Sequence, residues 1–247
     1  PDFDVEIQID DHGRRASPPA RGAHPAVVFV GDSMTFGWGV EGGEAFPSLL
    51  QDLLGGTSWN LGVAGFGTDQ ELLKLRTEGL SLRPDAIVVT LSANDIEDVR
   101  CSRRYGRSKP RFDLDGDRLR LEPPAASFLE RNSSFYRSLL YFLGTRTTPS
   151  PTRTELAAGR ALVLALLHAM AAEARAIHAP LLVLAANEPW LGGTLADEAD
   201  VRLVDVGPAL AAGPGPTTFP NDPHWTPAAH RVVAGEIAGA LGPMLAG

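Results

Sequence analysis

The sequence predicts an α/β protein: a three-layer α/β/α sandwich around a mostly five-stranded parallel sheet. Two short runs, 26–30 and 85–91, are rich in β-branched and other apolar residues, which is typical of strands covered on both faces. Segments predicted to be helical alternate with such strands, and this alternation indicates a parallel sheet with helices on both sides. The 247 residues suit a single domain, 1–247.

The predicted elements follow one another from residue 26 onward. Strands are expected at 26–30, 58–61, 85–91, 180–185 and, with a weaker pattern, 201–206. Helices are expected at 44–54, from Thr68 onward, at 155–177 and from Pro227 to about Leu241. Thr68 and Glu71 form a capping-box pattern, and Thr226 before Pro227 is an N-cap residue followed by proline at the first helical position.

Two segments fall outside this alternation. Residues 1–25 are polar and interrupted by glycine and proline, which predicts a peripheral N-terminal arm. Residues 97–151 predict an insertion or lid after the third strand, with a hairpin at Asp115-Gly116 and an amphipathic helix at 128–143. The insertion opens with a basic stretch that could attract an anionic substrate, although such charge runs more often face water. Its members are Arg100, Arg103, Arg104, Arg107, Lys109 and Arg111.

Composition narrows the classes of function. The net charge of -8 argues against a nucleic-acid groove, which requires a basic face, and favours a small-molecule or carbohydrate ester as partner. Cys101 is the one cysteine, so an intramolecular disulfide and a Cys-rich zinc site are excluded, and no metal or cofactor is expected. No apolar run approaches the roughly 20 residues of a membrane span. The chain starts at Pro1, so we expect a removed N-terminal segment, compatible with an extracytoplasmic location but leaving the compartment open.

Four sequence blocks contain residue types suited to catalysis, and each follows a predicted strand or precedes the last helix. Ligands of open parallel sheets bind beyond the carboxyl ends of the strands, so these positions are candidates for one shared cleft. The blocks are Gly31-Asp32-Ser33, Asn60 to Gly67, Ser92-Ala93-Asn94-Asp95 and Asn221-Asp222-Pro223-His224-Trp225. A serine hydroxyl becomes a useful nucleophile when a neighbouring base takes its proton, and an imidazole can do so at neutral pH.

Together these blocks resemble the SGNH (GDSL-type) hydrolase family, in particular its bacterial esterase- and lipase-like subgroup. The resemblance runs from about Val27 to the last helix and implies a flavodoxin-like sandwich. It implies Ser33 as nucleophile and His224 as base. It also implies an oxyanion hole formed by the backbone N–H groups of Ser33 and Gly65 and the side-chain amide of Asn94. The family usually has glycine two residues before this asparagine, whereas this chain has Ser92.

The acid that orients His224 also departs from the family pattern, which is Asp-x-x-His. Asn221 stands three residues before the histidine, and Asp222 stands two before it. A carboxylate both orients an imidazole and stabilises the imidazolium, whereas an amide supplies no charge. We therefore assign Asp222 as the third catalytic residue. The alternative is a Ser-His dyad supported by Asn221 or by nothing.

Each role has a simpler alternative. Ser33 could cap a helix, Asn94 could be an ordinary turn residue, and His224 could pack on Trp225. The four blocks in register favour the catalytic interpretation: a serine esterase that hydrolyses an acetyl or short acyl ester, on carbohydrate or lipid, through an acyl-serine intermediate. One alternative is an O-acyltransferase acting on a polysaccharide, because the Asp-x-His-Trp motif also resembles proteins of that kind. The other is a catalytically silent carbohydrate-binding module.

Overall fold

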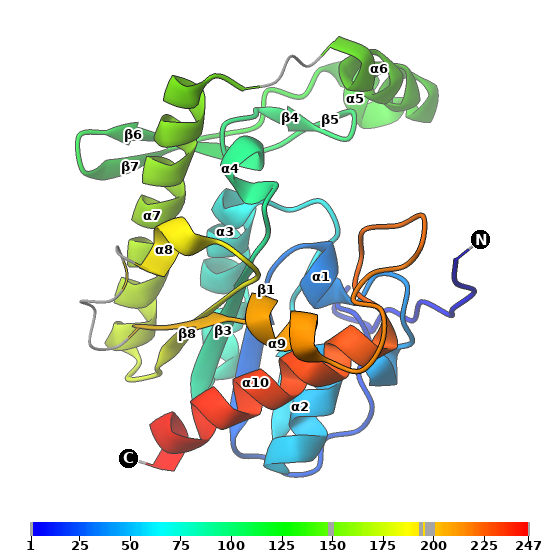
Figure 1. The fold of residues 1–247 in the computed structure, drawn as a ribbon. Coiled ribbons are helices and arrows are strands. Elements are labelled where there is room, and N and C mark those ends of the chain that lie inside the picture. Colours follow the sequence, from blue (N-terminus) through cyan, green and yellow to red (C-terminus); the bar gives the residue numbers. More distant parts are fainter. Residues whose placement is uncertain (1, 148–150, 193–194, 196–200, 247) are drawn as a thin grey trace.

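Five parallel strands form the central sheet of the computed structural model, which describes residues 2–147, 151–192, 195 and 201–246 (Figure 1). The strands are β1 (Ala26–Val30), β2 (Thr57–Asn60), β3 (Ala86–Leu91), β8 (Leu181–Ala185) and β9 (Val201–Asp205). Their order is β2-β1-β3-β8-β9, and every pair is parallel. The predicted fold class is therefore confirmed. The chain adds β2 on one side of β1 and the later strands on the other, so the topological switch point, where open parallel sheets bind ligands, lies between β1 and β3.

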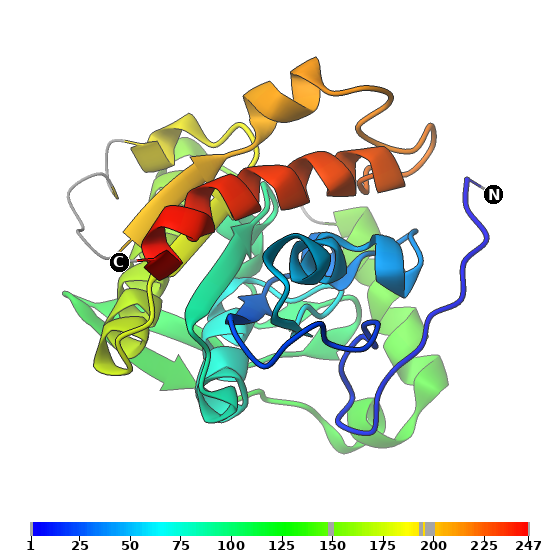
Figure 2. The same cartoon turned by 90° about the horizontal axis from the view of Figure 1, so that it is seen from below.

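Helices cover both faces of the sheet. On one face lie α2 (Phe46–Leu54), α9 (Gly207–Ala212) and α10 (Pro227–Ala246), and Figure 2 shows α10 crossing this face beside α2. On the other face lie α3 (Thr68–Thr77) and α7 (Arg153–Ala176). Successive residues of β1 serve the two cores in turn: Phe29 packs toward Phe46 of α2, and Val28 packs toward Leu75 of α3. Alternation of side chains along buried strands thus produces two separate apolar cores.

The helix caps follow the predictions in part. Thr226 accepts a hydrogen bond from the Ala229 N–H, and α10 begins at Pro227, as predicted. The capping box expected at Thr68 and Glu71 is wrong, because Gly67 is the N-cap of α3 and the Thr68 N–H donates to Asp95. A capping box forms instead at Thr152 and Glu155, where α7 begins.

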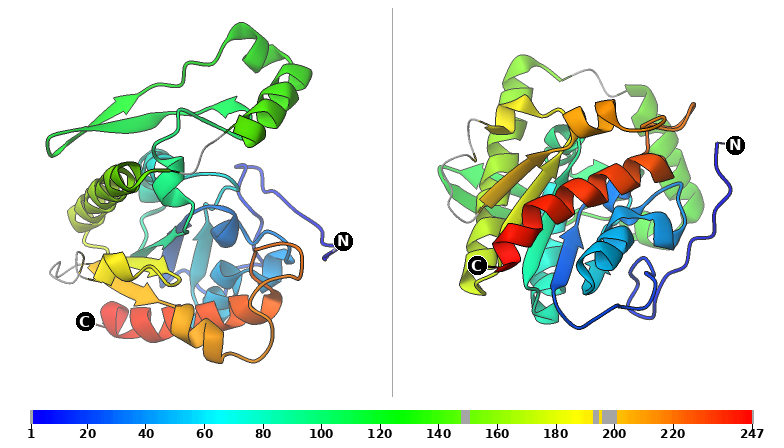
Figure 3. Two further views of the ribbon diagram at one scale, coloured as in Figure 1. Left: turned by 45° about the horizontal axis from the view of Figure 1, so that its top comes forward. Right: turned by 60° about the horizontal axis from the view of Figure 1, so that its bottom comes forward.

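The insertion consists of small hairpins and helices beyond the carboxyl edge of the sheet (Figure 3). Its elements are α4 (Asp95–Asp98), β4 (Arg103–Arg104), β5 (Arg107–Ser108), β6 (Arg111–Asp115), β7 (Arg118–Glu122), α5 (Phe128–Asn132) and α6 (Ser134–Thr147). The hairpin predicted at Asp115-Gly116 is present between β6 and β7. The single helix expected at 128–143 is wrong: Ser133 has extended backbone angles and separates α5 from α6.

Half of the basic stretch holds the insertion in place. Arg103 pairs with Glu130 at 2.8 Å and Arg104 with Asp98 at 2.7 Å, while the buried Lys109 contacts Asp69. Asp69 belongs to α3 in the body of the protein, so the Lys109 pair joins the body to the insertion, whereas Asp98 belongs to α4, where the insertion begins. These three side chains form ion pairs within the protein, so they neither simply face water nor stand free to attract an anionic substrate.

The N-terminal arm runs along the surface near the loop that precedes α10. Arg15 is 2% exposed and donates a hydrogen bond to the Val40 carbonyl at 2.9 Å. Asp2 accepts hydrogen bonds from both the backbone and the side chain of Asn221. The arm is thus held by polar contacts that join residues far apart in the sequence.

Helix α7 is long and apolar enough, by length and composition alone, to span a membrane, whereas the sequence analysis expected no such segment. Its buried residues, among them Leu166 and Met170, pack against the sheet. Core helices of soluble proteins pass the same criterion, so this feature is weak evidence for a membrane span.

His230, in α10, gives the fold a specific sensitivity to acid. The side chain is 1% exposed, its Nδ1 accepts the Phe46 N–H at 3.2 Å, and burial lowers its pKa from 6.5 to about 3. The unfolded chain therefore binds a proton near pH 6.5 that the folded chain does not bind until about pH 3. Stability from this group is present above pH 6.5 and is lost as the pH falls through that window.

We expect His230→Asn to remove this acid sensitivity, because an amide oxygen can accept the Phe46 N–H but is not protonated. Between pH 7 and pH 5 the wild type should lose about 2 kcal/mol more of its free energy of unfolding than the variant does. Urea unfolding at the two pH values measures the difference. Equal losses in the two proteins would show that His230 does not titrate on unfolding.

Candidate active site

Ser33 is presented at a tight turn directly after β1. Helix α1 (Ser33–Phe36) starts at this residue, and the Asp32 side chain caps it by accepting the Met34 N–H at 2.9 Å. The turn requires glycine at Gly31, where an added Cβ would lie 2.0 Å from the Thr35 Oγ1. Because Asp32 is the cap, the Ser33 hydroxyl is available for another partner, and the capping alternative for Ser33 does not describe this geometry.

That partner is His224, from the loop before α10. The His224 Nε2 lies 2.7 Å from the Ser33 Oγ, and its Nδ1 lies 2.5 Å from the Asp222 Oδ1. The His224 backbone N–H also donates to the same Asp222 oxygen at 2.9 Å. Burial raises the pKa of Asp222, but these two hydrogen bonds and the nearby imidazole outweigh burial and lower it overall. The carboxylate therefore stays ionised beside the ring.

Asn221 makes different contacts. Its side-chain Nδ2 donates to the Asp2 Oδ1 at 2.8 Å, and its backbone N–H donates to the Asp2 Oδ2 at 2.7 Å. Asn221 is thus engaged with the N-terminal arm, while the shorter Asp-x-His spacing lets Asp222 fold back onto the imidazole.

The three predicted oxyanion-hole donors border one cavity of about 420 Å³ together with Ser33 and His224. The Asn94 Nδ2 donates one hydrogen bond to the Asp98 Oδ2 at 2.8 Å, which leaves its second N–H for a ligand. Within the described part of the chain, the backbone N–H groups of Ser33 and Gly65 have no protein acceptor. The site residues predicted from the sequence therefore come together at the carboxyl edge of the sheet.

Ser92, which replaces the usual glycine of the family, is accommodated by polar contacts. Its backbone N–H donates to the Asp95 Oδ2 at 2.7 Å, and its side chain hydrogen-bonds the Asp32 carboxylate. Ser92 thus links the turn before Ser33 to the turn that carries Asn94.

A group of buried carboxylates lies behind these turns. Burial raises the pKa of every one of them, and neighbouring negative charges add to the effect for most of them. Lys109 and Arg104 offset the charge at two positions, whereas both Glu71 oxygens are without a hydrogen-bond partner among the described residues. We therefore expect Glu71 to be protonated in the folded protein. The group consists of Asp32, Asp69, Glu71, Asp95 and Asp98.

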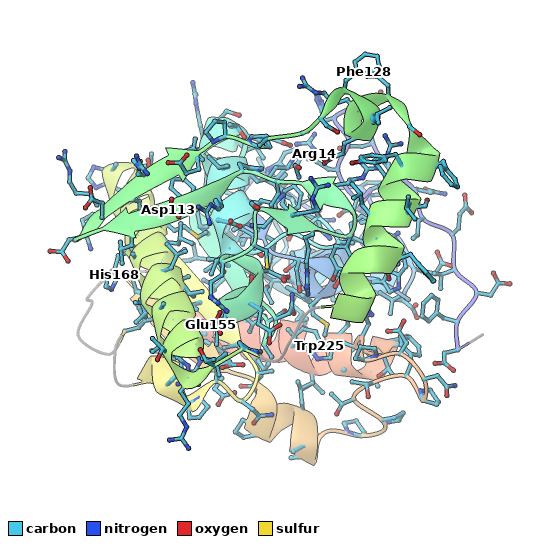
Figure 4. The ribbon with its side chains drawn as sticks, turned by 90° about the horizontal axis from the view of Figure 1, so that it is seen from above. Arg14, Asp113, Phe128, Glu155, His168 and Trp225 are labelled. Atoms are coloured by element: carbon cyan, nitrogen blue, oxygen red, sulfur yellow. The ribbon has the colours of Figure 1, made fainter. Side chains whose placement is uncertain are left out.

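Two tryptophans lie near the catalytic loop, and one of them contacts the His224 ring. The Trp38 ring centroid lies 6.2 Å from that of His224, and Trp225 is buried against Phe46 and His230. Seen from above, Trp225 lies beneath the insertion, between the projections of α7 and α6 (Figure 4). Trp38 was missed in the sequence, where nothing links it to a histidine 186 residues later.

One known protein family matches most of the chain. The sequence profile of the GDSL-like lipase/acylhydrolase family matches residues 29–232, which contain all the proposed site residues. No curated protein matches the chain in sequence.

Several solved structures share the fold at low sequence identity. TesA is 18% identical with a TM-score of 0.54, covering 89% of this chain and 99% of its own. The esterase EstA from Pseudoalteromonas sp. is 12% identical with a TM-score of 0.54, covering 90% and 100%. The acetylxylan esterase Axe2 from Geobacillus stearothermophilus is 14% identical with a TM-score of 0.52, covering 90% and 95%. At such identities the likeness concerns the fold.

Proposed function

This chain belongs to the GDSL-like lipase/acylhydrolase family, and from that premise we propose that it is a serine esterase acting on acetyl or short acyl esters through an acyl-serine intermediate. The protein is a hydrolase, and ester hydrolysis is the general reaction of its family. One observation carries the finer proposal: the hydrogen-bonded series Ser33, His224 and Asp222 opens onto a cavity that three hydrogen-bond donors also border.

The reaction proceeds in two halves. The Ser33 Oγ attacks the ester carbonyl carbon while the His224 Nε2 accepts its proton, and His224 then gives that proton to the departing alcohol. An acyl-serine remains. A water molecule then attacks the acyl carbon, His224 takes a proton from the water and returns it to Ser33, and the carboxylic acid leaves. Asp222 stabilises the imidazolium in both halves because its lowered pKa keeps it charged.

The carbonyl oxygen becomes negative in each tetrahedral intermediate. The N–H groups of Ser33, Gly65 and Asn94 are fixed before the substrate arrives, so they need little rearrangement to stabilise that charge. Asp98 accepts the hydrogen bond of the Asn94 amide at 2.8 Å, and the Arg104 guanidinium offsets the cost of burying the Asp98 carboxylate. Asp98 is therefore a positioning residue that acts through Asn94.

The cavity favours a modest, largely apolar acyl group. Met34, Leu91, Ala93 and Ala186 contribute apolar lining beside Ser33. A pocket of about 420 Å³ lies toward the small end of ligand sites, which are roughly 300–1,000 Å³. The cavity is compatible with an alcohol that belongs to a carbohydrate or to a lipid. A panel of p-nitrophenyl esters graded by acyl length, with acetylated xylan alongside, is the experiment that tests the proposal.

We expect Asn94→Ala to lower kcat by about two to three orders of magnitude with little change in KM, because the amide acts mainly in the transition state. Steady-state kinetics on p-nitrophenyl acetate measures the split. Asn132→Ala, which removes an exposed asparagine from α5, serves as the control and should behave as wild type. An effect confined to KM would make Asn94 a substrate-binding residue instead.

A further inference from the structure

The turn between β4 and β5 carries a tyrosine in a backbone conformation that tyrosine rarely adopts. The two strands pair Arg104 with Arg107, so Tyr105 and Gly106 are the two loop residues. Their φ angles are 48° and 73°. Two-residue hairpin loops with positive φ at both positions strongly favour Asn-Gly or Asp-Gly. A residue with a bulky side chain is strained there, and such strain is concentrated at functional sites.

Contacts on several sides hold the Tyr105 ring in one place. A Cβ added to Gly65 would lie 2.7 Å from the ring atom Cε2, so the ring edge rests directly on the loop that carries a proposed oxyanion donor. The Arg104 guanidinium lies over the ring at 5.0 Å from its centroid and pairs with Asp98, the residue that positions Asn94. Behind the turn, the Tyr141 ring lies 6.3 Å away.

The strained residue gains little from burial. Tyr105 is 53% exposed, so the hydrophobic effect gives no sufficient reason for an aromatic residue at this position. The ring nevertheless borders the cavity of the active site, together with Ser33, Asn94 and His224. An asparagine would suit this turn better but would not provide an aromatic ring. The ring of Tyr105 is therefore explained by the wall that it forms on one side of the cavity.

The position of the ring indicates which part of the substrate it meets. The leaving alcohol must lie beside His224, which donates its proton, and the ring that flanks His224 is Trp38. Tyr105 instead borders Gly65, one of the proposed oxyanion donors. It belongs to the insertion, which lies above α1, and not to the loop that carries His224 (Figure 1). The group that extends toward Tyr105 is then the acyl chain.

We propose that Tyr105 is a specificity-determining residue whose ring closes the acyl-binding part of the cavity and restricts the enzyme to short acyl chains. This inference rests on the proposed esterase function. The insertion thereby acts on specificity through one side chain at the tip of its first hairpin. The ion pair of Arg104 with Asp98 fixes that hairpin against α4, and the ion pair of Lys109 with Asp69 fixes it against α3 in the body of the protein.

Tyr105→Asn tests the proposal, because it removes the ring and supplies a residue that suits the left-handed conformation. For p-nitrophenyl octanoate relative to acetate, we expect the ratio of kcat/KM values to rise at least about tenfold. The melting temperature should stay the same or rise, since the turn is relieved. Tyr105→Phe keeps the ring and should keep the wild-type preference among esters. Tyr136→Asn makes the same chemical change in α6, outside the cavity lining, and is the matched control.

Three results would overturn the proposal. The first is an unchanged octanoate-to-acetate ratio in Tyr105→Asn. The second is a melting temperature several degrees lower, with an equal loss on every ester, because the ring would then serve stability; Tyr105→Gly, which also suits the turn, repeats the measurement in a second variant. The third is the same change in ratio in Tyr136→Asn. A wild type that cleaves none of the esters would instead refute the proposed function itself, and that outcome is seen before any variant is made.

Discussion

Ser33→Ala is expected to lower kcat by about four to six orders of magnitude, because it removes the nucleophile and leaves only binding and the oxyanion donors. The fold should remain intact, since the Ser33 hydroxyl bonds His224 at the edge of a cavity and its loss creates no buried void. Hydrolysis of p-nitrophenyl acetate gives the rate, and thermal unfolding followed by circular dichroism checks the fold. A fluorophosphonate probe should label the wild type and not the variant.

The matched control is Ser81→Ala, which removes an exposed hydroxyl bonded to the Glu78 carbonyl. It should keep wild-type activity and labelling. Ser33→Ala with more than a few per cent of the wild-type rate would place the nucleophile at another residue. A wild type that the probe does not label would favour the silent carbohydrate-binding module over an enzyme.

The central sheet could be predicted because its three inner strands, β1, β3 and β8, are buried on both faces. Five of the seven residues 85–91 are apolar, and the strand found is β3, Ala86–Leu91. The four sequence blocks could be placed together for a related reason: parallel strands bring their carboxyl ends to one edge, so Ser33 and Asn94 become neighbours without any knowledge of side-chain contacts.

Local patterns were less informative where tertiary contacts compete with them. Thr68 and Glu71 have the spacing of a capping box, but the buried Asp95 takes the Thr68 N–H, and Glu71 lies in the core. Thr152 and Glu155 have the same spacing at an exposed helix start, where no buried group competes, and there the box forms. The outcome depends on burial, which the spacing of the two residues does not encode.

The contact between the insertion and the body of the protein could not be predicted because it joins residues far apart in the sequence. In the sequence Lys109 is one member of a basic run, whereas its partner Asp69 belongs to α3, 40 residues earlier. Tyr105 carried one signal in the sequence, a Tyr-Gly pair between two short polar segments. Its meaning depends on Gly65, forty residues earlier, and therefore on the fold.

Asp222→Ala is expected to lower kcat by about three to four orders of magnitude, because His224 would lose both its orienting hydrogen bond and the charge that stabilises the imidazolium. Asp222→Asn keeps the shape and removes the charge, so it should be nearly as damaging. The pKa of Asp222 is lowered in the folded protein, so its carboxylate is ionised at the neutral pH of the assay. Steady-state kinetics on p-nitrophenyl acetate measures all of these effects.

Asn221→Ala is the matched variant, one residue away in the same loop. It removes a contact with Asp2 in the N-terminal arm and none with His224, so kcat should fall by no more than about tenfold, or roughly 1.4 kcal/mol. If both variants were close to wild type, Ser33 and His224 would act as a dyad. If Asn221→Ala were crippled and Asp222→Ala were active, the orienting group would stand at the usual family position, and the short hydrogen bond between Asp222 and His224 would have no catalytic role.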